Sequence, residues 1–97
     1  MKKSITLGNY VFNFNTAIEE NVKYIEFTYL VNDVTVKIFR ESFESALKYK
    51  PEFNSDYAVS ELPEDVWDYL YNNKMLNTLK GWVATQYLTI TIMETNS

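Results

Sequence analysis

Hydrophobic and polar residues alternate with a period of two over residues 22–40, on both sides of the pair Asn32-Asp33. This period is typical of β-strands with one buried face, and an Asn-Asp pair suits a two-residue hairpin turn. Such a turn fixes the register, so that Phe27 should face Ile38 and Ile25 should face Arg40. One face of the hairpin is then almost wholly apolar, and it carries Ile25, Phe27, Tyr29, Val31, Val34, Val36 and Ile38.

The residues before this hairpin also favour β-structure. The segments 5–7 and 10–14 have the composition of strands, and Gly8-Asn9 between them fits either a tight turn or a bulge within one longer strand. The aromatic residues of the second segment lie at alternate positions, so their side of the strand should face the core. Residues 15–21 are expected to form a polar connection.

After the hairpin the period of the apolar residues lengthens to about 3.6, which indicates a short helix with one apolar face. That face carries Phe43, Ala46 and Leu47. Ser42 suits the N-cap position of this helix, and Pro51 is expected to end it. Residues 51–60 should then form a loop that its two aromatic side chains pin to the rest of the protein.

A second helix is predicted to begin at Pro63, because proline suits the first helical position and the acids that follow suit the positive end of the helix dipole. It should end at Asn72-Asn73, with a buried side made of Leu62, Val66, Tyr69 and Leu70. A further helical turn over residues 74–80 is closed by Gly81. Residues 84–92 then return to a strand whose inward side chains are Leu88, Ile90 and Ile92.

Together these elements predict one compact domain over residues 1–97, of the α+β class. We expect a two-layer fold with an antiparallel sheet of about four strands and two or three short helices on one face of the sheet. The strand order stays open. The predicted core comprises Ile25, Phe27, Tyr29, Val31, Val34, Val36, Ile38, Phe43, Leu47, Val66, Leu70, Leu88 and Ile90.

The composition excludes several kinds of catalytic and metal site, because the chain contains no Cys and no His. A Ser-His-Asp triad, a Cys-His pair, a disulfide and a metal site built on Cys or His are therefore excluded. Residues 52–63 begin like a calcium loop, but Tyr57 and Pro63 stand where that loop needs Gly and Glu. No catalytic residue, cofactor or metal is expected. The first fifteen residues contain neither a signal-peptide core nor a membrane span, so we expect a soluble protein. The lack of Cys fits a reducing cytoplasm, and no motif points to catalysis, so we expect a cytoplasmic, non-enzymatic protein.

The charges are unevenly distributed along the chain. The formal charge of −4 combines −6 from residues 51–73, which contain no Lys or Arg, with +2 from the rest of the chain. Four acids of this segment follow the spacing i, i+3, i+4 and i+7, which would place them on one helical face with Trp67 and Tyr71 at its border. These four acids are Glu61, Glu64, Asp65 and Asp68.

This acidic stripe has two interpretations. Acids at a helix start stabilise the dipole, and an exposed helix face is normally polar, which is an ordinary structural explanation. The functional interpretation rests on the lack of neutralising Lys or Arg, on the cost of like charges at helical spacing, and on the frequency of Trp and Tyr among binding anchors. The second interpretation makes the stripe a binding surface.

The sequence therefore predicts a small acidic protein-binding module, an inhibitor or antagonist that docks on a basic partner such as a nucleic-acid-binding enzyme or a toxin. Carboxylates would mimic phosphates there. The candidate partner-binding residues are Asp56, Glu61, Glu64, Asp65, Trp67, Asp68 and Tyr71. In size, charge and lack of catalytic residues the chain resembles small acidic inhibitors of phages and other mobile elements as a class. Direct nucleic-acid binding is disfavoured, because nine scattered Lys and Arg residues stand against thirteen acids.

The alternative is a structural or assembly protein, for example a minor phage component. Such a protein would self-associate, as a homodimer or a larger assembly, through a sheet edge or through the outer face of the sheet. The aromatic residues expected on that face are Tyr24, Phe39 and Tyr87. The oligomeric state distinguishes this alternative from the protein-binding module.

Overall fold

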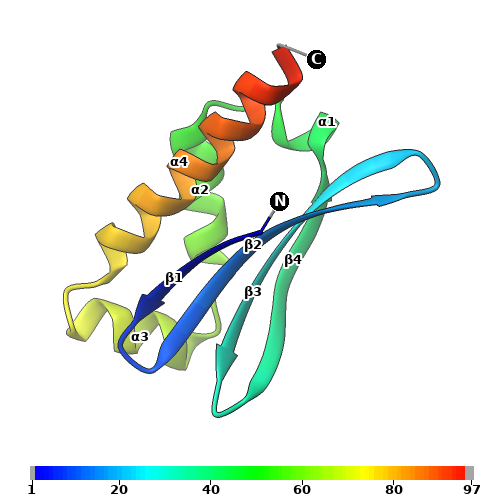
Figure 1. The fold of residues 1–97 in the computed structure, drawn as a ribbon. Coiled ribbons are helices and arrows are strands. Elements are labelled where there is room, and N and C mark those ends of the chain that lie inside the picture. Colours follow the sequence, from blue (N-terminus) through cyan, green and yellow to red (C-terminus); the bar gives the residue numbers. More distant parts are fainter. Residues whose placement is uncertain (1, 96–97) are drawn as a thin grey trace.

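The first half of the chain forms a meander of antiparallel strands, which lie side by side in the order β1-β2-β3-β4 (Figure 1). The computed structural model describes residues 2–95, so Met1, Asn96 and Ser97 of the predicted domain lie outside the described residues. The hairpin predicted over residues 22–40 is confirmed as β3 and β4. The strands are β1 (Lys2–Leu7), β2 (Tyr10–Glu19), β3 (Val22–Val31) and β4 (Val34–Ser42).

A two-residue turn joins each strand to the next. Asn32 and Asp33 both have positive φ, as a type I′ turn requires, and this turn matches the right-handed twist of its strands. Gly8 has a φ of +61° at the first position between β1 and β2, and Leu7 pairs with Tyr10 across it. Gly8-Asn9 is therefore a tight turn and not a bulge.

The polar connection expected over residues 15–21 is wrong. The strand β2 continues to Glu19, and only Glu20 and Asn21 form the turn, both with positive φ. Glutamate is uncommon at positive φ, so Glu20 does not indicate a turn in the sequence. The hairpin of β2 and β3 is therefore longer than the pattern predicted, and its end projects beyond the helices (Figure 1).

The register between β3 and β4 changes at a β-bulge. The four pairs next to the turn follow the predicted register, up to Thr28 opposite Lys37. The next predicted pairs are wrong by one residue, because Phe27 faces Phe39 instead of Ile38, and Ile25 faces Glu41 instead of Arg40. The extra residue in β4 turns Phe39 onto the inner face of the sheet, where its ring lies 5.5 Å from that of Phe27.

Four helices follow in the described part of the chain, and they pack against the inner face of the sheet (Figure 1). The N-cap predicted for the first helix is confirmed, because the Ser42 hydroxyl accepts a hydrogen bond from the backbone N–H of Ser45 at 3.1 Å. The longest helix, α4, packs along α2. The helices are α1 (Phe43–Ala46), α2 (Pro51–Ser60), α3 (Glu64–Asn72) and α4 (Leu76–Thr95).

The helix α2 corrects the loop that was expected over residues 51–60. Pro51 is its first residue, where a missing backbone N–H costs nothing, so this proline begins a helix instead of ending one. The buried side of α2 carries small and polar residues, namely Asn54, Ser55, Ala58 and Val59, while Phe53 and Tyr57 are exposed. An apolar period is therefore absent from its sequence.

The helix α4 corrects both the short turn over residues 74–80 and the strand expected over residues 84–92. It is one helix of 20 residues that passes through Gly81 without interruption. The buried residues Leu79, Val83, Tyr87 and Ile90 follow helical spacing, whereas Leu88 and Ile92 are exposed. Three Thr hydroxyls donate to backbone carbonyls one turn earlier, which satisfies them within the helix.

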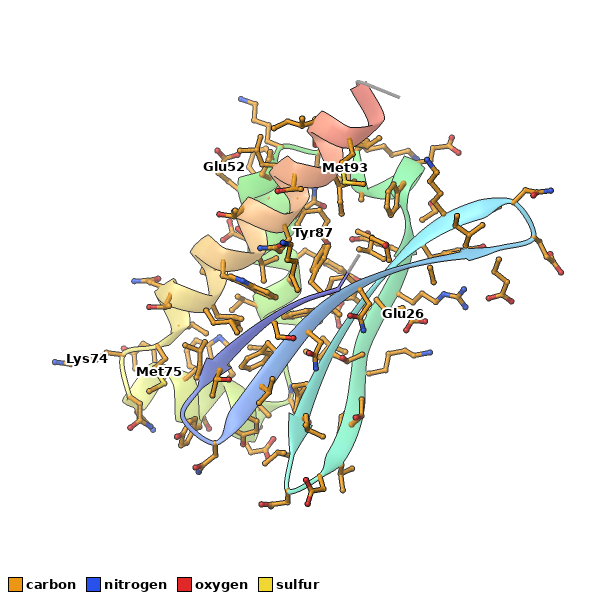
Figure 2. All side chains as sticks on the ribbon, in the orientation of Figure 1. Glu26, Glu52, Lys74, Met75, Tyr87 and Met93 are labelled. Atoms are coloured by element: carbon orange, nitrogen blue, oxygen red, sulfur yellow. The ribbon has the colours of Figure 1, made fainter. Side chains whose placement is uncertain are left out.

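The core lies between the inner face of the sheet and the helices (Figure 2). Of the predicted core residues, Ile25, Phe27, Tyr29, Phe43, Val66, Leu70 and Ile90 are buried. Val31, Val36 and Ile38 are partly buried against this core. Val34, Leu47 and Leu88 are exposed, so their assignment is wrong. The aromatic rings of β2 dominate the centre, because Phe12 and Phe14 are both fully buried.

Candidate functional site

The helix α3 presents three carboxylates to solvent. Glu64 and Asp65 lie in its first turn and Asp68 lies one turn further along, and all three are exposed. The first two stabilise the positive end of the helix dipole. Among the side chains that the structure describes, none of the ion pairs involves these three carboxylates. We call these three residues the acidic face of α3.

Two of the predicted partner-binding acids lie outside α3. The sequence spacing had placed Glu61 on the same helix as the acids of α3, but Glu61 is the C-cap of α2. The helix α3 begins only at Glu64, with Pro63 as its N-cap. Asp56 lies on α2 and its carboxylate pairs with the Lys80 ammonium of α4 at 2.6 Å. Three of the five predicted acids therefore share α3, and the charge of Asp56 is already matched within the molecule.

An aromatic pair borders the acidic face. The rings of Trp67 and Tyr71 are stacked, with their centroids 5.0 Å apart and their planes 10° from parallel. Trp67 is half-buried against the core, whereas Tyr71 is 61 % exposed. A hollow of about 640 Å³ adjoins Tyr71 at the end of α3. The predicted acids and the predicted aromatic residues of α3 therefore do lie together on one helix.

A contact with the sheet fixes the position of α3. The Tyr69 hydroxyl accepts a hydrogen bond from the backbone N–H of Asn9 at 3.2 Å, and the Tyr69 ring meets that of Tyr10 edge to face at 5.2 Å. A Cβ atom at Gly8 would stand only 2.0 Å from the Tyr69 hydroxyl oxygen, so glycine is required there for this contact as well as for the turn. The helix that carries the acidic face is thus anchored to the β1–β2 turn of the sheet through Tyr69.

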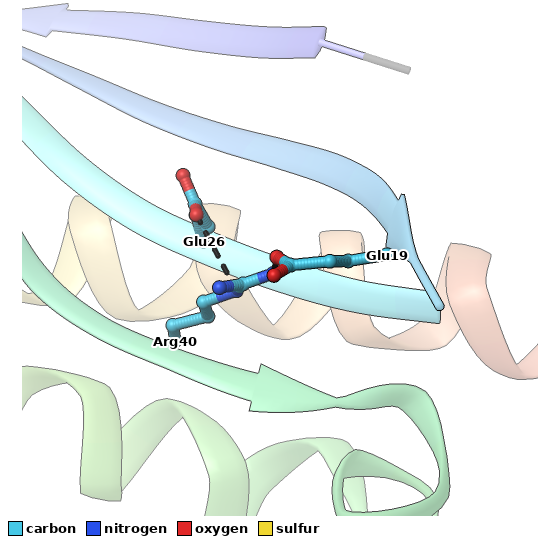
Figure 3. A network of polar contacts seen from close by, with 3 residues as sticks. All are labelled: Glu19, Glu26 and Arg40. Carbon is cyan, nitrogen blue, oxygen red and sulfur yellow. Dashed lines mark hydrogen bonds and ion pairs between the residues drawn. The ribbon is translucent and has the colours of Figure 1, made fainter. Parts of the chain in front are cut away.

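The outer face of the sheet differs from the aromatic surface that was predicted. Phe39 is buried in the core and Tyr87 lies on α4, so only Tyr24 of the predicted set remains on that face. The Arg40 guanidinium covers Tyr24 at 4.1 Å from its ring centroid. Arg40 also pairs with Glu19 at 2.5 Å and with Glu26 at 3.5 Å (Figure 3). This hydrogen-bonded ion pair lowers the pKa of Glu19.

A second candidate site was missed by sequence reasoning. It is a pocket of about 410 Å³ between the end of β4 and the helices α1 and α2, lined by Glu41, Ser45, Tyr49, Phe53, Asn54 and Tyr57. Two of its aromatic residues, Phe53 and Tyr57, are four apart on α2, a spacing that is a weak helical signal, whereas Tyr49 precedes that helix, which begins at Pro51. The expectation of a loop over residues 51–60 concealed this signal, because a loop assigns no common face to such residues.

The remaining chemistry of the described residues is limited. No group of three or more acidic residues among them is arranged to hold a metal ion. None of the helices between residues 2 and 95 combines the length and the apolar character that crossing a membrane requires. Comparison of the chain with protein-family models, with curated protein sequences and with solved structures finds no match.

Proposed function

We propose that this chain is a small acidic, non-enzymatic module that binds a basic protein partner through the acidic face of α3 and the adjoining Trp67–Tyr71 pair. The observation that supports this most is the combination of a stacked aromatic pair with three exposed carboxylates on one helix, none of which forms an ion pair with a described side chain. Trp and Tyr are the side chains most enriched among binding hot spots. The partner would be inhibited or antagonised by having its basic surface covered.

The physics of this binding divides into two parts. The carboxylates attract a positively charged surface over roughly a Debye length, which raises the association rate and makes it depend on salt. The aromatic pair is removed from water on contact, which lowers the dissociation rate. A basic surface that normally binds nucleic acid fits this chemistry best, because carboxylates can take the place of its phosphates.

A binding experiment with three variants tests the proposal. The tagged protein captures its partner from a lysate of the source organism, and the purified partner is then measured against Asp68→Lys, Trp67→Ala and Glu52→Lys. The first variant should slow association most at low salt, and the second should speed dissociation at any salt. Glu52→Lys makes the same change of charge on the exposed face of α2 and should leave both rates nearly unchanged.

The proposal fails if the affinity for the partner is insensitive to both α3 variants and to salt between roughly 0.05 and 0.3 M, where the screening of exposed charges changes most. It also fails if Glu52→Lys weakens binding as much as Asp68→Lys, because the effect would then follow net charge and not this surface. A captured protein without a basic surface would contradict the chemistry of the partner.

Self-association is the second candidate function, and one observation favours it. The exposed apolar residues Ile18 and Val22 lie at the projecting end of the β2–β3 hairpin, where β2 and β3 extend beyond their pairing with β1 and β4 and leave open strand edges. Exposed apolar side chains beside open strand edges are typical of subunit contacts. Light scattering after size-exclusion chromatography separates the two candidates, because a stable dimer lost in Ile18→Lys would favour self-association.

A further inference from the structure

The pocket between β4, α1 and α2 lies apart from the acidic face of α3, because α1 and α3 are at opposite ends of the helical layer (Figure 1). Its volume of about 410 Å³ falls in the range of sites for small ligands or single side chains. What it binds follows from the groups that line it. They comprise one carboxylate, three aromatic rings and two neutral polar side chains, with no Lys or Arg.

The carboxylate belongs to Glu41, which is half-buried at the end of β4. One of its oxygens, Oε1, accepts a hydrogen bond from the hydroxyl of Tyr87, a residue that is only 2 % exposed. Burial raises the pKa of Glu41, while the Tyr87 hydrogen bond lowers it. No ion pair among the described side chains includes Glu41, so its negative charge is held in the protein without a cation.

The aromatic rings form the mouth of the pocket. Tyr49 and Phe53 are 62 % and 61 % exposed, and Tyr57 is 44 % exposed. The Tyr57 ring is held in place by Phe39, whose centroid lies 5.4 Å from its own. Burial, followed by the nearby carboxylate of Glu61, raises the pKa of Tyr57, so a second acid lies beside the mouth. Ring faces attract cations and pack against methylene groups.

The polar lining also includes the side-chain amide of Asn54. The Nδ2 group of Asn54 donates to the carbonyls of Ala46 at 2.9 Å and Tyr49 at 3.3 Å, which uses both of its hydrogens. Its Oδ1 accepts no hydrogen bond from the described residues and remains available as an acceptor. A pocket with a carboxylate, an amide oxygen and ring faces but no cationic donor favours a positively charged group over an anion.

We propose that this pocket binds an organic cation, the guanidinium or ammonium end of a basic side chain, whose charge contacts Glu41 and whose methylene groups pack between Tyr49, Phe53 and Tyr57. This inference goes beyond the binding proposed for α3, because it assigns a separate site with its own ligand chemistry. Arginine is the preferred form, since its planar guanidinium both stacks on aromatic rings and pairs with a carboxylate.

An NMR titration at constant ionic strength tests this site. The probe is Nα-acetyl-arginine N-methylamide, and its neutral counterpart is the citrulline derivative, which has nearly the same shape. The arginine probe should give saturable shifts at Glu41 and at the three aromatic residues of the mouth, with citrulline binding about tenfold more weakly or worse. The matching lysine derivative shows whether the pocket prefers guanidinium over ammonium.

Variants separate this pocket from general charge effects. Glu41→Gln keeps an oxygen that can accept the Tyr87 hydrogen bond but removes the charge, so arginine binding should weaken about tenfold. Phe53→Ala removes an exposed ring and should weaken binding about threefold. Glu52→Gln removes an exposed acid of the same helix that does not line the pocket, and it should bind the probe like the unmodified protein.

Equal binding of the arginine and citrulline probes would overturn the proposal, as would shifts that map outside the pocket. Unchanged binding by Glu41→Gln, with its fold confirmed by a dispersed spectrum, would overturn it as well. Should Glu41→Gln fail to fold, Phe53→Ala decides the matter, because this side chain supports no part of the core. These results do not bear on the proposed binding of a basic partner by α3, which is tested with Trp67 and Asp68.

Discussion

The acidic face of α3 and the Glu41 pocket present negative charge in two different ways. On α3 three carboxylates extend into water, where they act over roughly a Debye length and impose little geometry. Glu41 is half-buried and oriented by the hydroxyl of Tyr87, so it acts only at contact distance and only on a group that fits beside it. The first arrangement suits the approach of a partner, and the second suits the selection of one chemical group.

The largest effect should come from the core on which both regions rest. Phe27 is fully buried, with the rings of Phe12 and Phe39 at 5.9 and 5.5 Å. Phe27→Ala should lower the free energy of unfolding by roughly 3 to 5 kcal/mol in urea denaturation. Thr28→Ala is the control, because Thr28 is also buried but lies on the opposite face of the same strand and loses only a small side chain. Equal losses in the two variants would contradict the assignment of the faces.

A smaller loss is expected from Tyr87→Phe, which removes the donor of Glu41 and keeps the ring. The loss of this hydrogen bond to a half-buried carboxylate should lower the free energy of unfolding by roughly 1 to 3 kcal/mol at neutral pH. The pKa of Glu41 should rise further, because the Tyr87 hydroxyl lowers it in the intact protein. Chemical denaturation measures the first effect and carbon NMR of the Glu41 carboxyl the second. Tyr71→Phe, at an exposed hydroxyl, should change neither.

The pH dependence of stability should separate Glu41 from the exposed acids. Because its pKa is raised in the folded state, Glu41 binds protons more tightly there than in the unfolded chain. Its contribution to stability is therefore fully present below the unfolded pKa of about 4.3 and is lost as the pH rises through the folded pKa. Glu41→Gln should thus gain stability relative to the unmodified protein between pH 4 and pH 7 in urea denaturation. A difference that is constant with pH would show that Glu41 is not desolvated.

The smallest effect on stability is expected for Asp68→Lys, because the residue is exposed and lies beyond the first turn of α3. The free energy of unfolding should change by no more than about 0.5 kcal/mol, as thermal or urea denaturation measures it. The association rate with a basic partner should nevertheless fall. A large loss of stability would mean that the α3 carboxylates serve the fold, and the difference between α3 and the Glu41 pocket would then be smaller.

The sequence predicted the elements whose signal is local. Asn32-Asp33 indicates a type I′ turn by its chemistry, and the capping of α1 by Ser42 and the acidic start of α3 were equally readable. The bulge in β4 was not, because alternation gives no sign of one additional residue. That single residue decides that Phe39 belongs to the core and that Arg40 lies over Tyr24.

The predictions for the segments that form α2 and α4 were wrong for opposite reasons. In α2 the buried side chains are small or polar, so the helix has no apolar stripe to detect. In α4 the apolar residues Leu88, Ile90 and Ile92 alternate with Thr residues, and β-branched residues are frequent in strands, so the segment resembles a strand in sequence. In the helix only Ile90 of these three is buried. The Glu41 pocket could not be predicted without α2, since Phe53 and Asn54 reach it only from a helix.

The long helix α4 has a consequence for how this chain folds during its synthesis. The meander has only local strand pairs, so it can form early, but its inner face then shows Phe12 and Phe14 to the solvent. The rings that cover Phe14 come from Trp82 and Tyr87, at 6.4 and 5.3 Å, and both belong to α4. A nascent chain that stops before residue 76 would therefore hold a sheet with a bare aromatic surface, the state in which aggregation or chaperone binding competes with folding.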